Sequence, residues 1–250
     1  MARCYPHVVR AAAATAAALA LLSAAGAASA QPGAAAPAQQ QQRGEQRTVE
    51  GLLARRSDGS YAPARFDPAA APPGLRSNNW VGIKGPNLQG RWPGQTGASE
   101  QGFARFDDPA ASVRAFVELV RQLQERHGAR SAADILRRYS PPGDCSGAPS
   151  LPPGERREGG GCPENETTPP VTAVRAARAV GLKPTDDLGL FGPGGRLDQP
   201  DRLRALLDAV VTQELGPGAC PQPPRGESWI GCRVDDAVFD RAVEALGRRG

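Results

Sequence analysis

Aromatic residues and lysines are scarce in this sequence. Phe, Trp and Tyr make up 5% of the 250 residues, and only two of the 30 basic residues are lysines, Lys84 and Lys183. Because arginine takes the place of lysine at nearly every basic position, an arginine does not by itself indicate a functional contact. The formal net charge is +4, and the arginines are scattered rather than clustered as in nucleic-acid-binding proteins. We therefore expect no nucleic-acid partner.

Long hydrophobic runs are also missing, except close to the N-terminus. Arg3 and Arg10 precede an alanine-rich apolar stretch that ends in Ala-Ser-Ala at 28–30. A charged start, a short apolar run and a small-x-small end are typical of a secretory signal peptide. No other segment approaches the ~20 apolar residues that span a bilayer. The sequence predicts a signal peptide at 1–30, a secreted or periplasmic location, and no stable membrane insertion after cleavage.

The cysteines show no close CxxC-type pair, although four remain once Cys4 is removed with the signal peptide. A zinc site built from four cysteines normally contains such pairs, so we expect no metal and no cofactor. An even number of cysteines in an oxidising compartment instead predicts disulfides. Of the three possible pairings we favour Cys145–Cys162 and Cys220–Cys232, because each closes a loop rich in Pro and Gly.

The segment after the signal peptide has no core-forming pattern. Residues 31–45 consist mostly of Gln, Ala and Pro, which is typical of a flexible linker. Within 46–73, the spacing of Val49, Leu52 and Leu53 allows one short helical turn before Pro and Ala take over. We assign 31–73 to a disordered, low-complexity linker and 74–250 to one folded domain.

Capping residues and apolar spacing predict five helices. The clearest begins after Asp108, with Pro109 in its first turn, and ends at Gly128. The next begins with a capping box formed by Ser131 and Asp134. Further helices are expected at about 170–180, 200–216 and 235–246. The segment 78–106 lacks a helical period and predicts a small β-rich lobe, so the expected fold class is mainly α, of the α+β type.

The motifs in this lobe occur in a recognisable order. They are NNWVGIKG at 78–85, W-x-G at 92–94, T-x-x-S-E at 96–100 and GFARFDDPAASVRAF at 102–116. This order resembles bacterial glucosaminidases of the flagellar and cell-wall type, which belong to the lysozyme-like superfamily. The resemblance implies a lysozyme-like fold and peptidoglycan glycan strands as the partner.

A second resemblance, which we consider the closer one, is to phage and prophage proteins described as virion structural proteins. It rests on GFARFDDP, RHGARSAADILRRYSPP, PENETTPPV and VTQELG. In those proteins the Pro-Pro and Glu-Asn-x-Thr motifs are adjacent, whereas an insertion at 143–162 separates them here. Cys145 and Cys162 flank this insertion, and a disulfide between them would close it at its base. The two resemblances together cover residues 74–216.

The glucosaminidases carry their catalytic Glu just upstream of the Asn-Asn segment, but residues 54–77 contain no Glu. Glu214 is the substitute we favour, because it continues the apolar face of the predicted helix at 200–216. Burial and the negative helix end both raise a carboxyl pKa, as a glycosidase acid requires. Glu100 matches the second carboxylate of the family. The alternatives are a solvated last-turn residue for Glu214 and a solvated loop residue for Glu100.

Asn79, Trp80 and Trp92 are the candidate substrate-binding residues, since indole rings stack on sugars; core packing is the alternative for the tryptophans. His127 lies in a helix's last turn and is expected to cap carbonyl groups, so nucleophilic hydrolase chemistry is not indicated. One hypothesis is an exported lysozyme-like domain that binds peptidoglycan glycan strands and, if active, is a glycoside hydrolase that cleaves them. The other is a non-catalytic, phage-derived structural or binding module in the periplasm.

Overall fold

The computed structural model describes residues 46–85, 92–140, 170–223, 227 and 229–247. All of them belong to the unit of the chain that spans Gln42–Gly250. The expected signal peptide and the Cys145–Cys162 pair lie outside the described residues and stay predictions.

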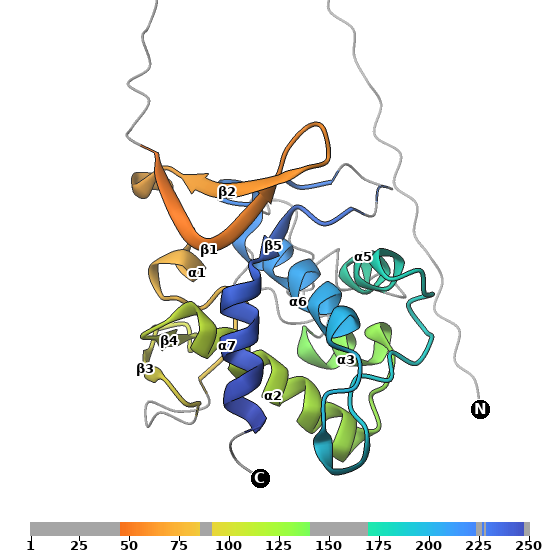
Figure 1. The fold of residues 1–250 in the computed structure, drawn as a ribbon. Helices are drawn as coiled ribbons and strands as arrows, with labels where there is room; N and C mark the ends of the chain where they lie inside the picture. The colour runs from red at the N-terminus through yellow and green to blue at the C-terminus, as the bar shows by residue number, and fades with distance from the viewer. Residues whose placement is uncertain (1–45, 86–91, 141–169, 224–226, 228, 248–250) are drawn as a thin grey trace, which may run out of the picture. The chain divides into compact units, whose positions relative to one another are not determined.

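The fold is a mixed α+β arrangement, in which the described residues form six α-helices and two small antiparallel sheets (Figure 1). The helices are α1 (Pro73–Arg76), α2 (Pro109–His127), α3 (Ala132–Tyr139), α5 (Val171–Ala179), α6 (Pro200–Leu215) and α7 (Asp236–Gly247). The strands are β1 (Arg47–Arg55), β2 (Tyr61–Phe66), β3 (Gln95–Ala98), β4 (Ala104–Phe106) and β5 (Cys232–Val234). The five expected helices are thus confirmed, and the short α1 is an addition to them.

Local capping explains where the helices begin and end. The Asp108 carboxylate accepts a hydrogen bond from the Ala110 amide at 2.6 Å, and Gly128 ends α2 in the left-handed conformation at φ 63°. Ser131 Oγ accepts from the Asp134 amide at 3.1 Å at the start of α3. Such contacts satisfy backbone groups that have no partner inside the helix. Because these signals lie within a few residues of each helix end, the sequence alone predicted them.

The expected linker is wrong from residue 46 onward, because 47–66 contains β1 and β2 rather than a disordered segment or a helical turn. β1 pairs antiparallel with β2 and also with β5, where Leu52 lies opposite Val234. Leu52 is fully buried. The pairing with β5 joins segments about 180 residues apart, so no local pattern could reveal it.

The β-rich lobe expected at 78–106 contains the second sheet, in which β3 and β4 pair antiparallel. Phe106 at the end of β4 is buried and donates its backbone N–H to the Ser77 carbonyl at 2.9 Å. An isolated bridge joins Lys84 to Phe103. These contacts attach the NNWVGIKG segment to the lobe.

Helix α6 runs through the interior and contacts α5 and β5, while α7 contacts α2 (Figure 1). Ten of the sixteen residues of α6 are buried, from Leu203 to Leu215.

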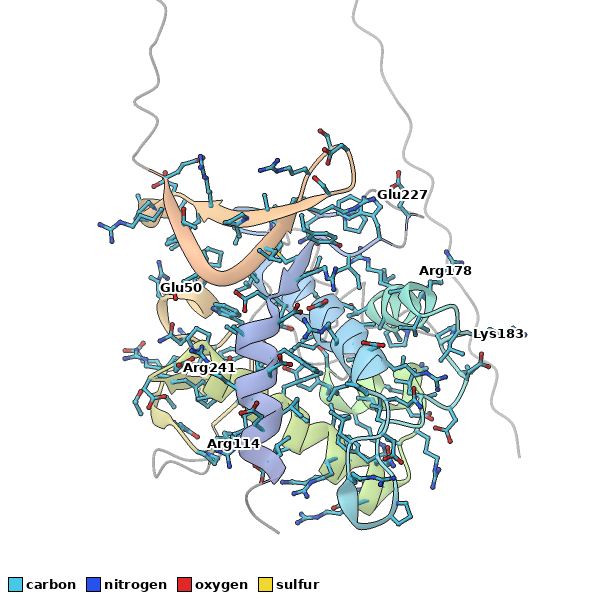
Figure 2. All side chains as sticks on the ribbon, viewed as in Figure 1. Glu50, Arg114, Arg178, Lys183, Glu227 and Arg241 are labelled. Atoms are coloured by element: carbon cyan, nitrogen blue, oxygen red, sulfur yellow. A yellow bond between two sulfur atoms is a disulfide. The ribbon has the colours of Figure 1, made fainter. Side chains whose placement is uncertain are left out.

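Charged side chains such as Glu50, Lys183 and Arg241 project outward from the ribbon (Figure 2). Among the described helices, none combines the length and the apolar character that crossing a bilayer requires.

Cys220 and Cys232 form a disulfide, as expected, with their Cα atoms 5.3 Å apart. Both cysteines are fully buried. The bond links the turn after α6 to the first residue of β5. It therefore helps to hold β5 against α6 from one end of the strand.

Candidate functional site

Asn79 has a structural role in the fold. Its side chain is 2% exposed. The amide donates to the carbonyl oxygens of Ile83 and Ala104, each at 2.9 Å, and its oxygen accepts from the Ile83 backbone N–H at 2.9 Å. These bonds occupy both ends of the amide, so Asn79 holds the NNWVGIKG turn against β4 and is not presented to a glycan.

The two tryptophans expected to stack on sugars belong to the core. Trp80 is 1% exposed and Trp92 is 6% exposed. Trp92 Nε1 donates to the Lys84 carbonyl at 3.4 Å. Because a sugar must cover an exposed ring face, neither indole can stack on a ligand in this structure. With so few aromatic residues in the chain, the fold uses these large rings for packing.

Glu100 lies in the turn between β3 and β4 and is exposed to solvent. The resemblance implies a strand for this carboxylate, whereas β3 ends at Ala98, two residues before Glu100. The exposure agrees with the alternative of a solvated loop residue.

Glu214 lies in the last turn of α6 and is half-buried. Its carboxylate packs against Gly82, where a Cβ atom would overlap Glu214 Oε2 and would lie 2.7 Å from Glu214 Cδ. Gly82 has a φ of 66°, a conformation that glycine adopts without steric cost. The end of α6 therefore lies directly against the NNWVGIKG segment, and a side chain at position 82 would require the Glu214 carboxylate to move.

A small depression lies beside Glu214. Tyr139, Thr172 and Gln213 contribute to its lining, and its volume is about 10 Å³. The Tyr139 hydroxyl donates to the Val81 carbonyl, next to Gly82. A volume of this size holds about one water molecule and is too small for a sugar ring.

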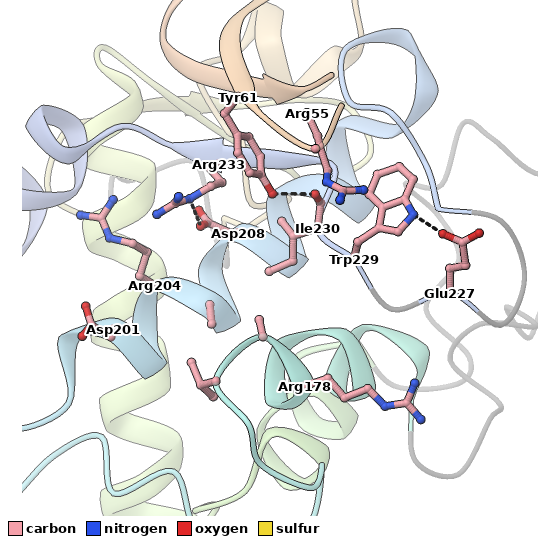
Figure 3. Close-up of a pocket in the computed structure, with 14 residues that line it drawn as sticks. Arg55, Tyr61, Arg178, Asp201, Arg204, Asp208, Glu227, Trp229, Ile230 and Arg233 are labelled. Atoms are coloured by element: carbon pink, nitrogen blue, oxygen red, sulfur yellow. Dashed lines mark hydrogen bonds and ion pairs between the residues drawn. The ribbon is translucent and has the colours of Figure 1, made fainter. Parts of the chain in front are cut away.

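A much larger pocket, of about 850 Å³, lies between the β1–β2–β5 sheet and the helices α5 and α6 (Figure 3). Four arginines from four different elements line it, and we call it the arginine pocket: Arg55, Arg178, Arg204 and Arg233. Its acidic lining residues are Asp201, Asp208 and Glu227. The volume falls within the range that binds small molecules.

Asp208 is a buried carboxylate in the wall of the arginine pocket, with 2% of its surface exposed. Burial raises its pKa from 3.8 to about 7, although the Val234 backbone N–H, Arg233 and Arg204 act in the opposite direction. Oδ1 accepts from the Val234 N–H at 2.9 Å, and Oδ2 lies 3.6 Å from Arg233 Nε. A carboxyl that titrates near neutral pH inside a pocket is a common feature of functional sites.

Sequence reasoning missed Asp208 and the arginine pocket. One available signal was an Asp inside LRALLDAVV, a segment that is otherwise apolar except for Arg204, at a position where the helix is buried on nearly every side. The pocket itself had no local signal, because its arginines come from segments between residues 55 and 233.

In comparisons with known proteins, no family model matches the chain and no curated protein is significantly similar to it.

Proposed function

We propose that the chain is an exported lysozyme-like domain that binds the glycan strands of peptidoglycan, and that Glu214 acts as its acid. The observation that carries this proposal is the contact between the Glu214 carboxylate and Gly82. Gly82 belongs to NNWVGIKG, the segment that resembles the glucosaminidases. In that family the catalytic Glu precedes this segment in the sequence, whereas here a later helix would deliver it.

The surroundings of Glu214 support this role. A general acid needs a fixed position and partial removal from water, so that it stays protonated until it reaches the glycosidic oxygen. Glu214 is half-buried at the end of a buried helix. The Tyr139 hydroxyl bonds the carbonyl of Val81 and so steadies the backbone beside Gly82.

Glycosidases of this kind use two carboxylates, about 5–9.5 Å apart, on either side of the scissile bond. We propose Glu100 as the second carboxylate, because it lies on the β-rich lobe and is accessible to solvent. The depression beside Glu214 cannot hold a sugar ring, so a glycan strand would contact Glu214 along the outer surface.

The test is a zymogram on purified cell wall, run beside a sedimentation assay with insoluble peptidoglycan. The proteins are the wild type, Glu214→Gln and Glu125→Gln. Glu125 is a matched control because it is an exposed helical glutamate, paired with Arg121 on α2. We expect the wild type and Glu125→Gln to sediment with peptidoglycan and clear it, and Glu214→Gln to sediment without clearing.

Other outcomes separate the alternatives. Clearing by Glu214→Gln at the wild-type rate would show that another group is the acid. Sedimentation of the wild type without clearing would favour the second hypothesis, a non-catalytic phage-derived binding module in the periplasm. Failure to sediment would overturn the proposal of peptidoglycan binding altogether.

A further inference from the structure

The register of the three-stranded sheet gathers charged and aromatic side chains on one face. Leu53 of β1 lies opposite Arg233 of β5, and Arg55 of β1 lies opposite Tyr61 of β2. Residues two apart on a strand point to the same side of a sheet. Arg55, Tyr61 and Arg233 therefore share one face, and all three line the arginine pocket (Figure 3).

Aromatic rings hold two of the arginines in place. The Arg55 guanidinium lies 4.7 Å from the centre of the Trp229 ring, and that of Arg233 lies 5.3 Å from the centre of the Tyr61 ring. Stacking of this kind orients a guanidinium before a ligand arrives, which reduces the entropy lost on binding.

The arginines of the pocket differ in the ion pairs and stacking contacts that they already make with other residues of the chain. Arg204 is 14% exposed, pairs with Asp236 at 2.8 Å and stacks on Phe239, so it is a structural residue. Arg55 forms no ion pair with a described residue, and Arg233 reaches Asp208 only at 3.6 Å with 44% of its side chain exposed. Two oriented cations are thus available to a ligand.

From these contacts we propose that the arginine pocket binds a small ligand with two carboxylate groups, one paired with Arg55 and the other with Arg233. The planar guanidinium fork matches a carboxylate through two parallel hydrogen bonds. The pocket is large enough for a free dicarboxylic acid or an acidic peptide of a few residues. This inference does not depend on the role proposed for Glu214.

Asp208 makes this binding depend on pH. It competes with the ligand for Arg233, and the charged or titratable groups that face it are Arg233 on β5, Arg204 on its own helix and Tyr61 on β2. When Asp208 is protonated, Arg233 is free to pair with the ligand. Affinity for a dicarboxylate should therefore rise as the pH falls from 8 to 6.

Isothermal titration with glutarate tests the proposal, using Arg55→Gln and, as a matched control, Arg65→Gln. Arg65 is an exposed arginine on β2 of the same sheet, outside the pocket. We expect Arg55→Gln to weaken glutarate binding at least tenfold, as the loss of a charged hydrogen bond does. Arg65→Gln should bind like the wild type. Equal affinities of the two variants would overturn the proposal.

Asp208→Asn gives a result that misfolding cannot imitate, because the expected change is a gain. Removing the competing carboxylate should tighten glutarate binding about tenfold at pH 8 and abolish the rise in affinity between pH 8 and 6. No gain at pH 8 would contradict the assignment of Arg233 as a ligand-binding group.

Two further probes define the ligand. Sulfate carries two charges on one group and cannot bridge two arginines in the same way, so it should bind at least tenfold more weakly than glutarate. Equal binding of sulfate would overturn the proposal of two carboxylates. Tighter binding of the peptide N-acetyl-Glu-Glu than of glutarate would identify an acidic peptide as the source, and the reverse order a free dicarboxylic acid.

Discussion

Asp208 and Thr212 stand four residues apart on α6 and are almost completely buried, which is unusual for polar side chains in the interior of a helix. Both hydrogen-bond the backbone of β5 at the edge that does not pair with β1. Asp208 accepts from Val234, and Thr212 accepts from Cys232 and Gly231. Each side chain replaces a hydrogen bond that a neighbouring strand would otherwise supply.

The raised pKa of Asp208 predicts a pH-dependent stability. The native state holds this proton up to about pH 7, whereas the unfolded chain loses it near pH 3.8. Because the native state binds more protons in this window, the stability contributed by protonated Asp208 is lost as the pH rises from 4 to 7. Relative to Asp208→Asn, which does not titrate, the wild type should lose about 4 kcal/mol across the window. Urea unfolding of both proteins at pH 4 and pH 8 measures this difference, and parallel pH dependences would contradict it.

Gly82 and Gly128 form a matched pair for testing the contact with Glu214. Their φ angles are 66° and 63°, but a Cβ atom would meet Glu214 at Gly82 and nothing within 4 Å at Gly128. We expect Gly128→Ala to lower the free energy of unfolding by about 1 kcal/mol through backbone strain alone. Gly82→Ala should cost more, because the Glu214 side chain must move.

The excess cost at Gly82 should vanish when Glu214 is truncated. In a Glu214→Ala background, Gly82→Ala and Gly128→Ala should destabilise equally, as measured by chemical unfolding of the single and double variants. An excess that persists in this background would mean that Gly82 is needed for a reason other than Glu214.

At the scale of elements, β5 has only three residues and is held mostly by other elements. β1 pairs with one edge of β5, and the side chains of Asp208 and Thr212 on α6 accept hydrogen bonds from its other edge. The first residue of the strand, Cys232, is also held by the disulfide. A strand this short has little stability of its own. Its order therefore depends on α6, which also carries Glu214 at its last turn and Asp208 in its middle.

Thr212→Val tests the dependence of β5 on α6. Valine keeps the shape of the side chain but leaves the backbone N–H groups of Gly231 and Cys232 without an acceptor in the interior. The expected loss of unfolding free energy is about 2–6 kcal/mol, at about 1–3 kcal/mol for each of the two unsatisfied groups. Thr96→Val, at an exposed site on β3, should change it by less than about 0.5 kcal/mol. Equal effects in denaturant unfolding would contradict this role of Thr212.

Across the whole molecule, the folded unit begins earlier than the composition of the sequence indicates. β1 supplies Leu52 to the core and the pairing edge for β5, so residues 46–66 are part of the domain. Removing them would expose the side of β5 that now faces β1.

Two shortened chains test this boundary, one starting at residue 42 and the other at residue 74. The chain 42–250 should melt cooperatively. The chain 74–250 should melt about 10 °C lower or fail to fold, because losing Leu52 alone is worth about 2–5 kcal/mol. Thermal unfolding followed by circular dichroism measures both, and identical melting temperatures would restore the boundary at 74.

The five longer helices, their ends and the favoured Cys220–Cys232 pairing could be predicted from the sequence. Asp108, Gly128 and Ser131 act on backbone groups within a few residues of themselves, and the disulfide joins cysteines twelve positions apart. Contacts between residues this close in the sequence can be predicted from local sequence patterns.

Which side chains form the core, and which come together in a site, could not be predicted and follows from tertiary packing. The same tryptophan can stack on a sugar or fill the interior, and its neighbours in space made the choice for Trp80 and Trp92. The pairing of β1 with β5, the burial of Asp208 and the gathering of four arginines all join residues far apart in the chain. Their physical cause is packing between distant segments, which composition and periodicity do not encode locally.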